Sequence, residues 1–290
     1  MQWLLLALIS AVFASAALLI EKKTLAREHA MEFSAALAFF NLILSVPFLF
    51  FVDYSRLQII PLVYIFFLMI LVAMAFLLIA KSIRHMEVSA VAPFLALTPA
   101  VTAIFAFMFF NEALGPIQIL GIALILIGAY VLELHSAHNL LEPFRIILKS
   151  KYVHFVILGV VIYGVSASFD RMILSKYDFQ PLAYLVFANI FLAFHFSIMM
   201  SMFHDGFRGL RKSINKFGWM LLLLSVFTIA YRLSMFEALK VEFAGLVVSV
   251  QKMSVFFAVV IGGGIFKERS ILRKAVASLI MIGGMLFIIL

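Results

Sequence analysis

The chain alternates long apolar runs with short segments that carry most of its charges. Each run approaches the roughly 20 apolar residues that cross about 30 Å of hydrocarbon. A helix satisfies all of its backbone polar groups internally, and the runs lack the alternation of barrel strands. The pattern therefore predicts an all-α membrane protein with ten transmembrane helices. They lie near residues 2–20, 33–52, 59–80, 88–110, 114–134, 153–172, 181–203, 217–238, 243–266 and 272–290.

The two halves of the chain end in one repeated pattern, 156 residues apart. The paired positions are Arg84 and Lys240, Thr98 and Ser254, Phe110 and Phe266, Glu112 and Glu268, and Gly128 and Gly284. Each copy holds an odd number of crossings, so the second copy enters the membrane from the opposite side. We expect two inverted five-helix repeats, 1–134 and 152–290, joined by a linker at 135–151. Inverted repeats of this kind hold the substrate between them near the midplane.

Composition narrows the chemistry. Hydrophobic residues make up 66% of the chain and charged residues 12%, which excludes an ordinary soluble domain. The net charge of +8 sits in short loops, so we expect a bilayer and no nucleic acid as partner. Cysteine is absent and the seven histidines are scattered, so we expect no metal site and no cofactor. The expected oligomeric state is a monomer or a homodimer.

The basic residues also predict an orientation. Loops after the first, third, fifth, seventh and ninth runs carry most of the Lys and Arg residues, and basic loops remain in the cytoplasm. The opposite side holds only Arg56, Arg171, Lys176 and Lys240. The charge distribution therefore places both termini outside the cytoplasm.

A family resemblance covers nearly the whole chain. The first copy carries it in Ser89, Pro93, Thr98, Pro99, Asn111, Glu112, Gln118, Gly121 and Gly128. These residues resemble the end of an EamA repeat, which defines a branch of the drug/metabolite transporter superfamily. In the second copy Phe266, Glu268 and Gly284 fit, whereas Val255 replaces a proline and Ala277 the first glycine.

The resemblance implies ten helices in two inverted halves, and secondary transport by alternating access without an ATPase module. It favours export, and it implies termini in the cytoplasm, opposite to the charge distribution. We expect a multi-pass protein of the cytoplasmic membrane of a prokaryote.

Lys252 is the sharpest candidate for substrate binding. It stands near the centre of the predicted ninth helix, next to Gln251. A charge in the hydrocarbon costs roughly 2.5 to 3.5 kcal/mol, so such a residue faces a cavity or a partner. Lys252 and Gln251 are therefore candidate ligands for an anionic group, and a structural ion pair is the alternative.

The predicted eighth helix offers a second pair of candidates, Tyr231 and Arg232. Arg232 stands about five residues from the expected end of the helix near Glu237, where its side chain could instead reach the interface. Either residue could line a cavity.

Carboxylates occur at matching places in the two halves. Asp170 follows Ser166 near the end of the sixth helix, and Glu21 ends the first. We consider Asp170 and Glu21 candidates for proton coupling, because burial can bring a carboxyl pKa toward neutrality. Ser166 is a candidate substrate ligand. The alternative is a carboxylate at a helix end in contact with water.

The remaining candidates concern proton relay and shape. His195 could relay protons or hydrogen-bond a neighbouring helix. Pro93, Pro99, Gly262 and Gly263 interrupt or loosen the fourth and ninth helices, so they are candidates for a hinge or for shaping the cavity. Glu112 and Glu268 are expected to cap the helices that follow them.

Together these features predict a secondary transporter for a small polar metabolite, such as an amino acid or a related anionic or zwitterionic solute, and not an enzyme. A proton is a candidate coupling ion. One alternative is multidrug efflux, although the first helix lacks a central carboxylate for lipophilic cations. Another is an intramembrane lipid-modifying enzyme, for which the scattered histidines give no motif.

The orientation can be tested on this cysteine-free chain. The charge distribution predicts that a single cysteine introduced at residue 1 reacts with a membrane-impermeant maleimide added to intact cells. Protection until the membrane is permeabilised would show that the termini are cytoplasmic.

Overall fold

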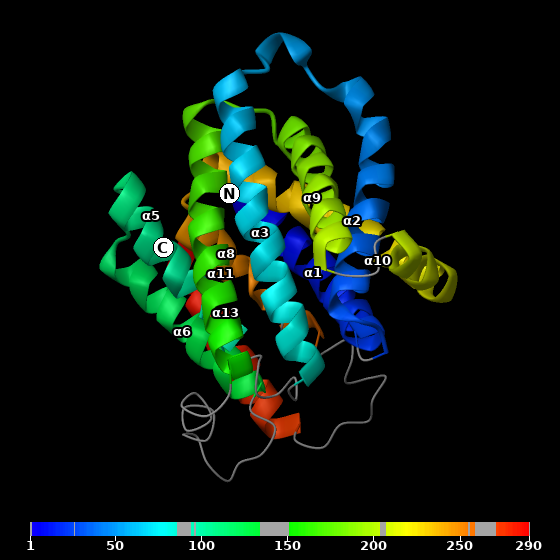
Figure 1. The fold of residues 1–290 in the computed structure, drawn as a ribbon. Coiled ribbons are helices and arrows are strands. Elements are labelled where there is room, and N and C mark those ends of the chain that lie inside the picture. Colours follow the sequence, from blue (N-terminus) through cyan, green and yellow to red (C-terminus); the bar gives the residue numbers. More distant parts are fainter. Residues whose placement is uncertain are drawn as a thin grey trace.

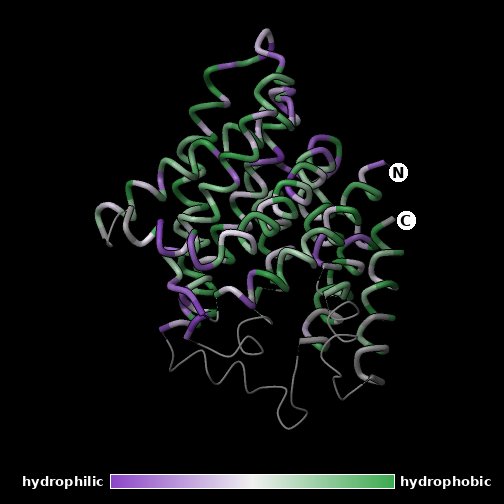
Figure 2. Tube along the Cα trace, turned by 90° about the vertical axis from the view of Figure 1, so that its right-hand side faces the viewer, coloured by the Kyte–Doolittle hydropathy of each residue, from purple (hydrophilic) through white to green (hydrophobic). Residues whose placement is uncertain are grey.

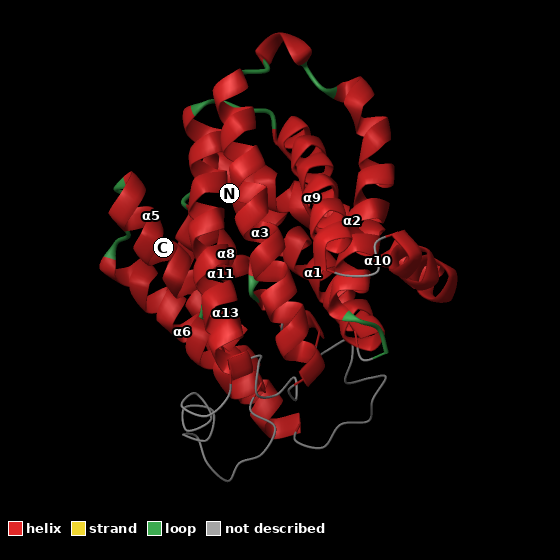
Figure 3. Ribbon diagram, in the orientation of Figure 1, coloured by secondary structure: helices red, strands yellow, loops and turns green. Residues whose placement is uncertain are grey.

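The computed structural model describes residues 2–25, 27–85, 94–95, 97–133, 151–203, 207–254, 256–258 and 271–289. Within these ranges the regular structure is helical (Figure 3). The first half holds α1 (Gln2–Leu25), α2 (Ala30–Ser45), the 3-10 turns η1 (Val46–Phe51) and η2 (Tyr54–Arg56), α3 (Ile59–His85), α5 (Thr98–Phe110) and α6 (Pro116–Glu133). The second holds α8 (Lys151–Lys176), α9 (Pro181–Phe203), α10 (Phe207–Val241), α11 (Ala244–Gln251) and α13 (Ile271–Ile289).

The helices form one bundle, and most of its trace is hydrophobic (Figures 1 and 2). Among the described residues, six helical segments are long and apolar enough to cross a membrane: Gln2–Leu25, Ala30–Phe51, Ile59–His85, Lys151–Lys176, Pro181–Met202 and Gly209–Val241. Helices α5, α6, α11 and α13 contain shorter apolar stretches. The predicted all-helical membrane fold is confirmed, and the number of ten crossings stays a prediction. The linker 135–150 lies outside the described residues.

The fourth and ninth runs are not single straight helices. Helix α5 begins at Thr98 after a turn at Leu97, and α11 ends at Gln251 before a turn at Lys252. Pro99 lies in the first turn of α5, where a missing N–H breaks no hydrogen bond. The regular helix of the two runs is thus interrupted at nearly equivalent places. Pro93, Gly262 and Gly263 lie outside the described residues.

The junction between α5 and α6 is fixed by local chemistry. Asn111 takes the left-handed conformation at φ 55° and ends α5. The Gln118 side chain accepts a hydrogen bond from the Gly115 N–H at 3.0 Å, and Pro116 opens α6. The sequence expectation that Glu112 caps this helix is wrong, because Gln118 occupies that role.

Helix contacts are exchanged between the halves as a two-fold relation requires. Helix α1 packs on α10, and its counterpart α8 packs on α3. Likewise α2 packs on α10, and its counterpart α9 packs on α3. The corresponding helices α2 and α9 contact each other, and so do α6 and α13. Each half therefore buries the other's helices, so the core belongs to both.

The crossing of α6 and α13 shows this relation at single residues. An added Cβ on Gly121 would lie 2.7 Å from the carbonyl oxygen of Gly284, and one on Gly128 would lie 2.9 Å from that of Ala277. Gly121 corresponds to Ala277 and Gly128 to Gly284 in the 156-residue repeat, so the two contacts are exchanged copies of each other. Small residues let the two backbones approach closely where hydrophobic attraction between helices is absent.

This crossing predicts different outcomes at two adjacent glycines of α13. In Gly284→Ala the new Cβ would lie 2.7 Å from the Gly121 oxygen and 2.8 Å from the Ile125 nitrogen. We expect a loss of about 1 to 3 kcal/mol in the free energy of unfolding, as for overpacked cores. Gly283→Ala is the matched control, because no atom lies within 4 Å of its Cβ and alanine favours the helix. Equal melting temperatures of the two variants in detergent would contradict the proposed crossing.

Candidate functional site

Arg232 lies at the centre of a cluster of polar side chains from α1, α8 and α10. Its guanidinium interacts electrostatically with the carboxylates of Glu21 and Asp170. The hydroxyls of Tyr163 and the adjacent Tyr231 belong to the same network. The charged groups that interact with Arg232 thus come from both halves of the chain.

The cluster is anchored to the surrounding helices. The Tyr184 hydroxyl of α9 donates a hydrogen bond to Oδ1 of Asp170, and the Tyr184 ring packs edge-on against Phe236 with centroids 4.7 Å apart. Ser10 donates a hydrogen bond to the carbonyl oxygen of Tyr231 at 2.8 Å, which joins α1 to α10. These contacts limit how far the charged groups can separate.

Burial differs within the cluster. Asp170 and Tyr184 are buried, whereas Glu21, Tyr163, Tyr231 and Arg232 keep part of their surface accessible. Both carboxylates stand inside their helices, since α1 continues to Leu25 and α8 to Lys176. The helix-end interpretation is therefore wrong for Asp170, which does not contact bulk water. Arg232 also stands well before the end of α10 at Val241 and faces carboxylates.

The three further candidates for substrate binding are Lys252, Gln251 and Ser166. Lys252 occupies the turn after α11 instead of the middle of a straight helix, and both it and Gln251 are partly exposed. Ser166 is buried on α8, four residues before Asp170 and thus on the same face.

His195 packs between α9 and α3. One ring nitrogen, Nε2, lies 3.0 Å from the carbonyl oxygen of Phe66, and the two rings stand 4.8 Å apart. Its position on α9 is 11 residues from Tyr184, or about 16 Å along the axis. This geometry favours the helix-packing alternative over a relay with Asp170.

A second polar site links the halves at one end of the bundle. Arg171 Nε lies 3.3 Å from Oε1 of Glu112, and Oε2 of Glu112 accepts the N–H of Ala244, at 3.0 Å. Arg171 Nη1 also donates to the carbonyl oxygens of Leu239 and Lys240, at 2.8 and 2.5 Å. Glu112 thus caps α11, a helix of the other half.

We call the ion pair of Arg171 with Glu112, together with these backbone contacts, the Arg171 hub. Lys240 extends it outward through an ion pair with Asp178, with Nζ and Oδ1 2.7 Å apart. That hydrogen bond lowers the pKa of the exposed Asp178. The hub fastens the α5–α6 junction to α8, to the last turn of α10 and to the first residue of α11.

The residues of the hub could be recognised only in part from the sequence. Each half carries an acidic residue followed by a basic one at the matching place, Glu21 with Lys22 and Asp170 with Arg171. Only the acidic residue of each pair was a predicted site residue. Tyr163 and Tyr184 are not distinctive in the sequence, because each is one tyrosine among many aromatic residues of the apolar runs. Two surface hollows lie elsewhere, outside α10 and between α2 and α9.

These features define an integral membrane helical bundle whose halves share one polar cluster. The model of the EamA-like transporter family matches residues 1–134 and 150–290. The chain therefore belongs to the EamA-like transporter family, and the predicted membership in the drug/metabolite transporter superfamily is confirmed.

Other comparisons bear on the fold alone. A comparison with curated proteins returns no match. A solved structure titled only "Crystal structure of protein" aligns with 98% of this chain and 95% of its own, at a TM-score of 0.72 and 13% identity. The bundle is thus similar to a known architecture.

The Arg171 hub predicts that Glu112→Gln, which removes one charge and keeps the size of the side chain, lowers the stability of the protein. In Glu112→Gln the nearly buried Arg171 loses its counterion, and breaking a buried pair costs about 3 kcal/mol or more. We expect a clear fall in the melting temperature in detergent. The matched control is Asp53→Asn in the exposed pair with Arg56, which contributes at most about 1 kcal/mol. Similar small shifts in the two variants would show that the hub does not hold the halves together.

Proposed function

We propose that this protein is a secondary transporter for an amino acid or a related anionic or zwitterionic metabolite. The observation that carries the proposal is the electrostatic interaction of Arg232 with Glu21 and Asp170, which belong to different halves of the chain. A site shared by both halves is where an inverted-repeat transporter binds its solute. Export is the favoured direction, as the family resemblance implies.

The chemistry of the cluster suits a zwitterion. A guanidinium presents planar N–H donors that match a carboxylate in a bidentate arrangement. The partly exposed Glu21 offers an acceptor for an ammonium group, and the hydroxyls of Tyr163 and Tyr231 offer further hydrogen bonds. In this proposal Arg232 binds the substrate carboxylate, and Lys252, Gln251 and Ser166 extend the site.

The same cluster weighs against multidrug efflux. Lipophilic cations need an unpaired carboxylate in an apolar cavity, whereas Glu21 and Asp170 both interact with Arg232. The enzyme alternative finds no support from the family, which is one of transporters. Transport is therefore the function that fits the cluster and the family together.

The proposed cycle is alternating access between two inverted repeats, 1–134 and 152–290, with ten crossings in a prokaryotic cytoplasmic membrane. The Arg171 hub links the two halves at one end of the bundle. Lys22 and Glu268 are its counterparts in the sequence repeats. We propose that breaking the hub opens that end, with the turns at Leu97 and Lys252 as the places where the helices bend.

We also propose that Asp170 and Glu21 couple transport to a proton. Asp170 is buried and accepts the Tyr184 hydroxyl, so a protonation change there would alter its contact with Arg232. His195 remains a weaker candidate because its ring nitrogen faces the Phe66 carbonyl oxygen.

Transport in proteoliposomes tests the role of Arg232. A panel of radiolabelled amino acids and related anions identifies the substrate class with the parent protein. We expect Arg232→Gln to lower transport efficiency by at least roughly 30-fold, since removing one partner of a desolvated charge pair costs about 2 kcal/mol or more. Arg232→Lys should recover part of it, because charge remains while the bidentate geometry is lost.

The control is Arg56→Gln, which removes an exposed arginine far from the cluster in sequence. Melting curves verify that each variant is folded. Normal transport by a folded Arg232→Gln protein would end the substrate role. Accumulation that is unchanged after the pH gradient is collapsed would reject proton coupling while leaving the substrate proposal intact.

A further inference from the structure

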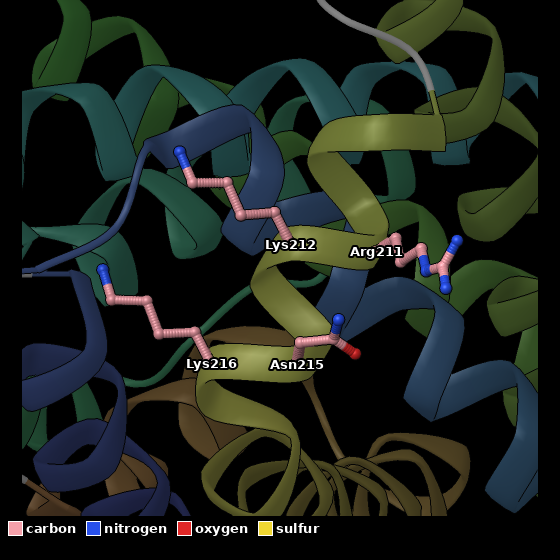
Figure 4. Close-up of a pocket in the computed structure, with 4 residues that line it drawn as sticks. All are labelled: Arg211, Lys212, Asn215 and Lys216. Carbon is pink, nitrogen blue, oxygen red and sulfur yellow. The ribbon is translucent and has the colours of Figure 1, made fainter.

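The N-terminal part of α10 carries a basic surface that the transport proposal does not use. Arg211, Lys212, Asn215 and Lys216 line a shallow hollow of about 530 Å³ (Figure 4). Their side chains fan out from both sides of the helix, Lys212 and Lys216 on one side and Arg211 and Asn215 on the other. We call this hollow the basic pocket.

The charge of the basic pocket is poorly compensated. Lys216 reaches Oε2 of Glu28 at 3.4 Å and the carbonyl oxygen of Arg27 at 3.1 Å. Arg211 and Lys212 are exposed, and no carboxylate in the described part of the chain pairs with them. The first turn of α10 holds no acidic residue. Basic residues near the N-terminus of a helix are unfavourable, because the helix dipole is positive there. An external anion would relieve this imbalance.

The position of the pocket along α10 points to the membrane interface. Arg211, Asn215, Trp219 and Leu223 succeed one another at intervals of four residues and thus share one face of the helix. Trp219 is 76% exposed, and exposed tryptophans gather at the headgroup level of membranes. The basic residues lie about 5 to 12 Å farther along the axis, a distance that reaches through the headgroup region and just beyond it.

An apolar groove begins next to the basic pocket. The groove has a volume of about 310 Å³ and is lined mainly by α2 and α9, including Phe39, Leu42, Ile190 and Phe194. Leu210, which immediately precedes Arg211, also lines it. The first turn of α10 is held against α2 and α9 at Gly209, where an added Cβ would lie 2.9 Å from Glu32 and 3.0 Å from Met200.

We propose that the basic pocket binds the headgroup of an anionic phospholipid whose acyl chain lies along the α2–α9 groove. Arg211 and Lys212 are the main phosphate ligands, with Lys216 and the Asn215 amide beside them. A membrane lipid fits better than free phosphate, because Trp219 places the pocket at the interface and the groove supplies an apolar site next to it. The proposal concerns the lipid-facing surface and stands or falls independently of the transported substrate.

Trp219 provides a local probe of this site. The chain has two tryptophans, so Trp3→Phe leaves Trp219 as the single fluorophore. The protein is reconstituted in phosphatidylcholine vesicles that contain increasing fractions of brominated phosphatidylglycerol or brominated phosphatidylcholine. We expect the anionic lipid to quench Trp219 at the lower mole fraction. In Arg211→Gln with Lys212→Gln the relative affinity should fall by up to roughly 30-fold, at about fivefold for each cation.

The matched control removes two basic residues elsewhere, with Lys81→Gln and Arg84→Gln near the C-terminal end of α3. It should keep the preference for the anionic lipid, as should the charge-preserving pair Arg211→Lys with Lys212→Arg. Equal quenching by the two lipids in the parent, or an unchanged preference after loss of Arg211 and Lys212, overturns the proposal. An equal loss in the control would indicate a diffuse charge effect, and competition by inorganic phosphate would identify a soluble anion instead; either result also overturns it.

Discussion

Hydrocarbon cannot solvate an isolated charge, and this constraint governs how the helices of this transporter meet. Arg232 stands inside a membrane-spanning helix, so it requires anionic partners from neighbouring helices. Glu21 on α1 and Asp170 on α8 supply them. The network joins α1 of the first half to α8 and α10 of the second, and Tyr184 adds α9. The interactions of one guanidinium thus involve helices from both halves of the chain.

The structure divides its tasks between symmetric and asymmetric residues. The crossing of α6 and α13 uses small residues that correspond in the two repeats, so it serves as shared scaffold. The Arg232 cluster is different, because the position 156 residues earlier is Phe76, which packs against the Phe33 and Phe196 rings. One half therefore presents an arginine where the other presents an aromatic ring. A bound solute would meet chemically different walls.

The Arg171 hub joins the two halves of the chain through several polar contacts that depend on one another. At the Arg171 hub, Glu112 accepts hydrogen bonds both from a side chain and from the first turn of a helix in the other half. Separating the halves would expose the arginine, the carboxylate and the N-terminus of α11 at once. These polar contacts therefore concentrate at one place the cost of separating the two halves.

The helical membrane fold and the family could be predicted from the sequence, and so could Arg232, Asp170 and Glu21 as single candidate residues. Apolar run length and the cost of a buried charge are local properties that any single segment displays. Which residues these side chains interact with could be seen only in the folded structure. It placed Lys252 in a turn, His195 against a backbone carbonyl, and Glu112 on a helix of the opposite half. The contacts of His195 with Phe66 and of Glu112 with Ala244 join residues more than 100 positions apart. Helix periodicity predicts the face on which a side chain lies, but not the neighbour that this face will touch.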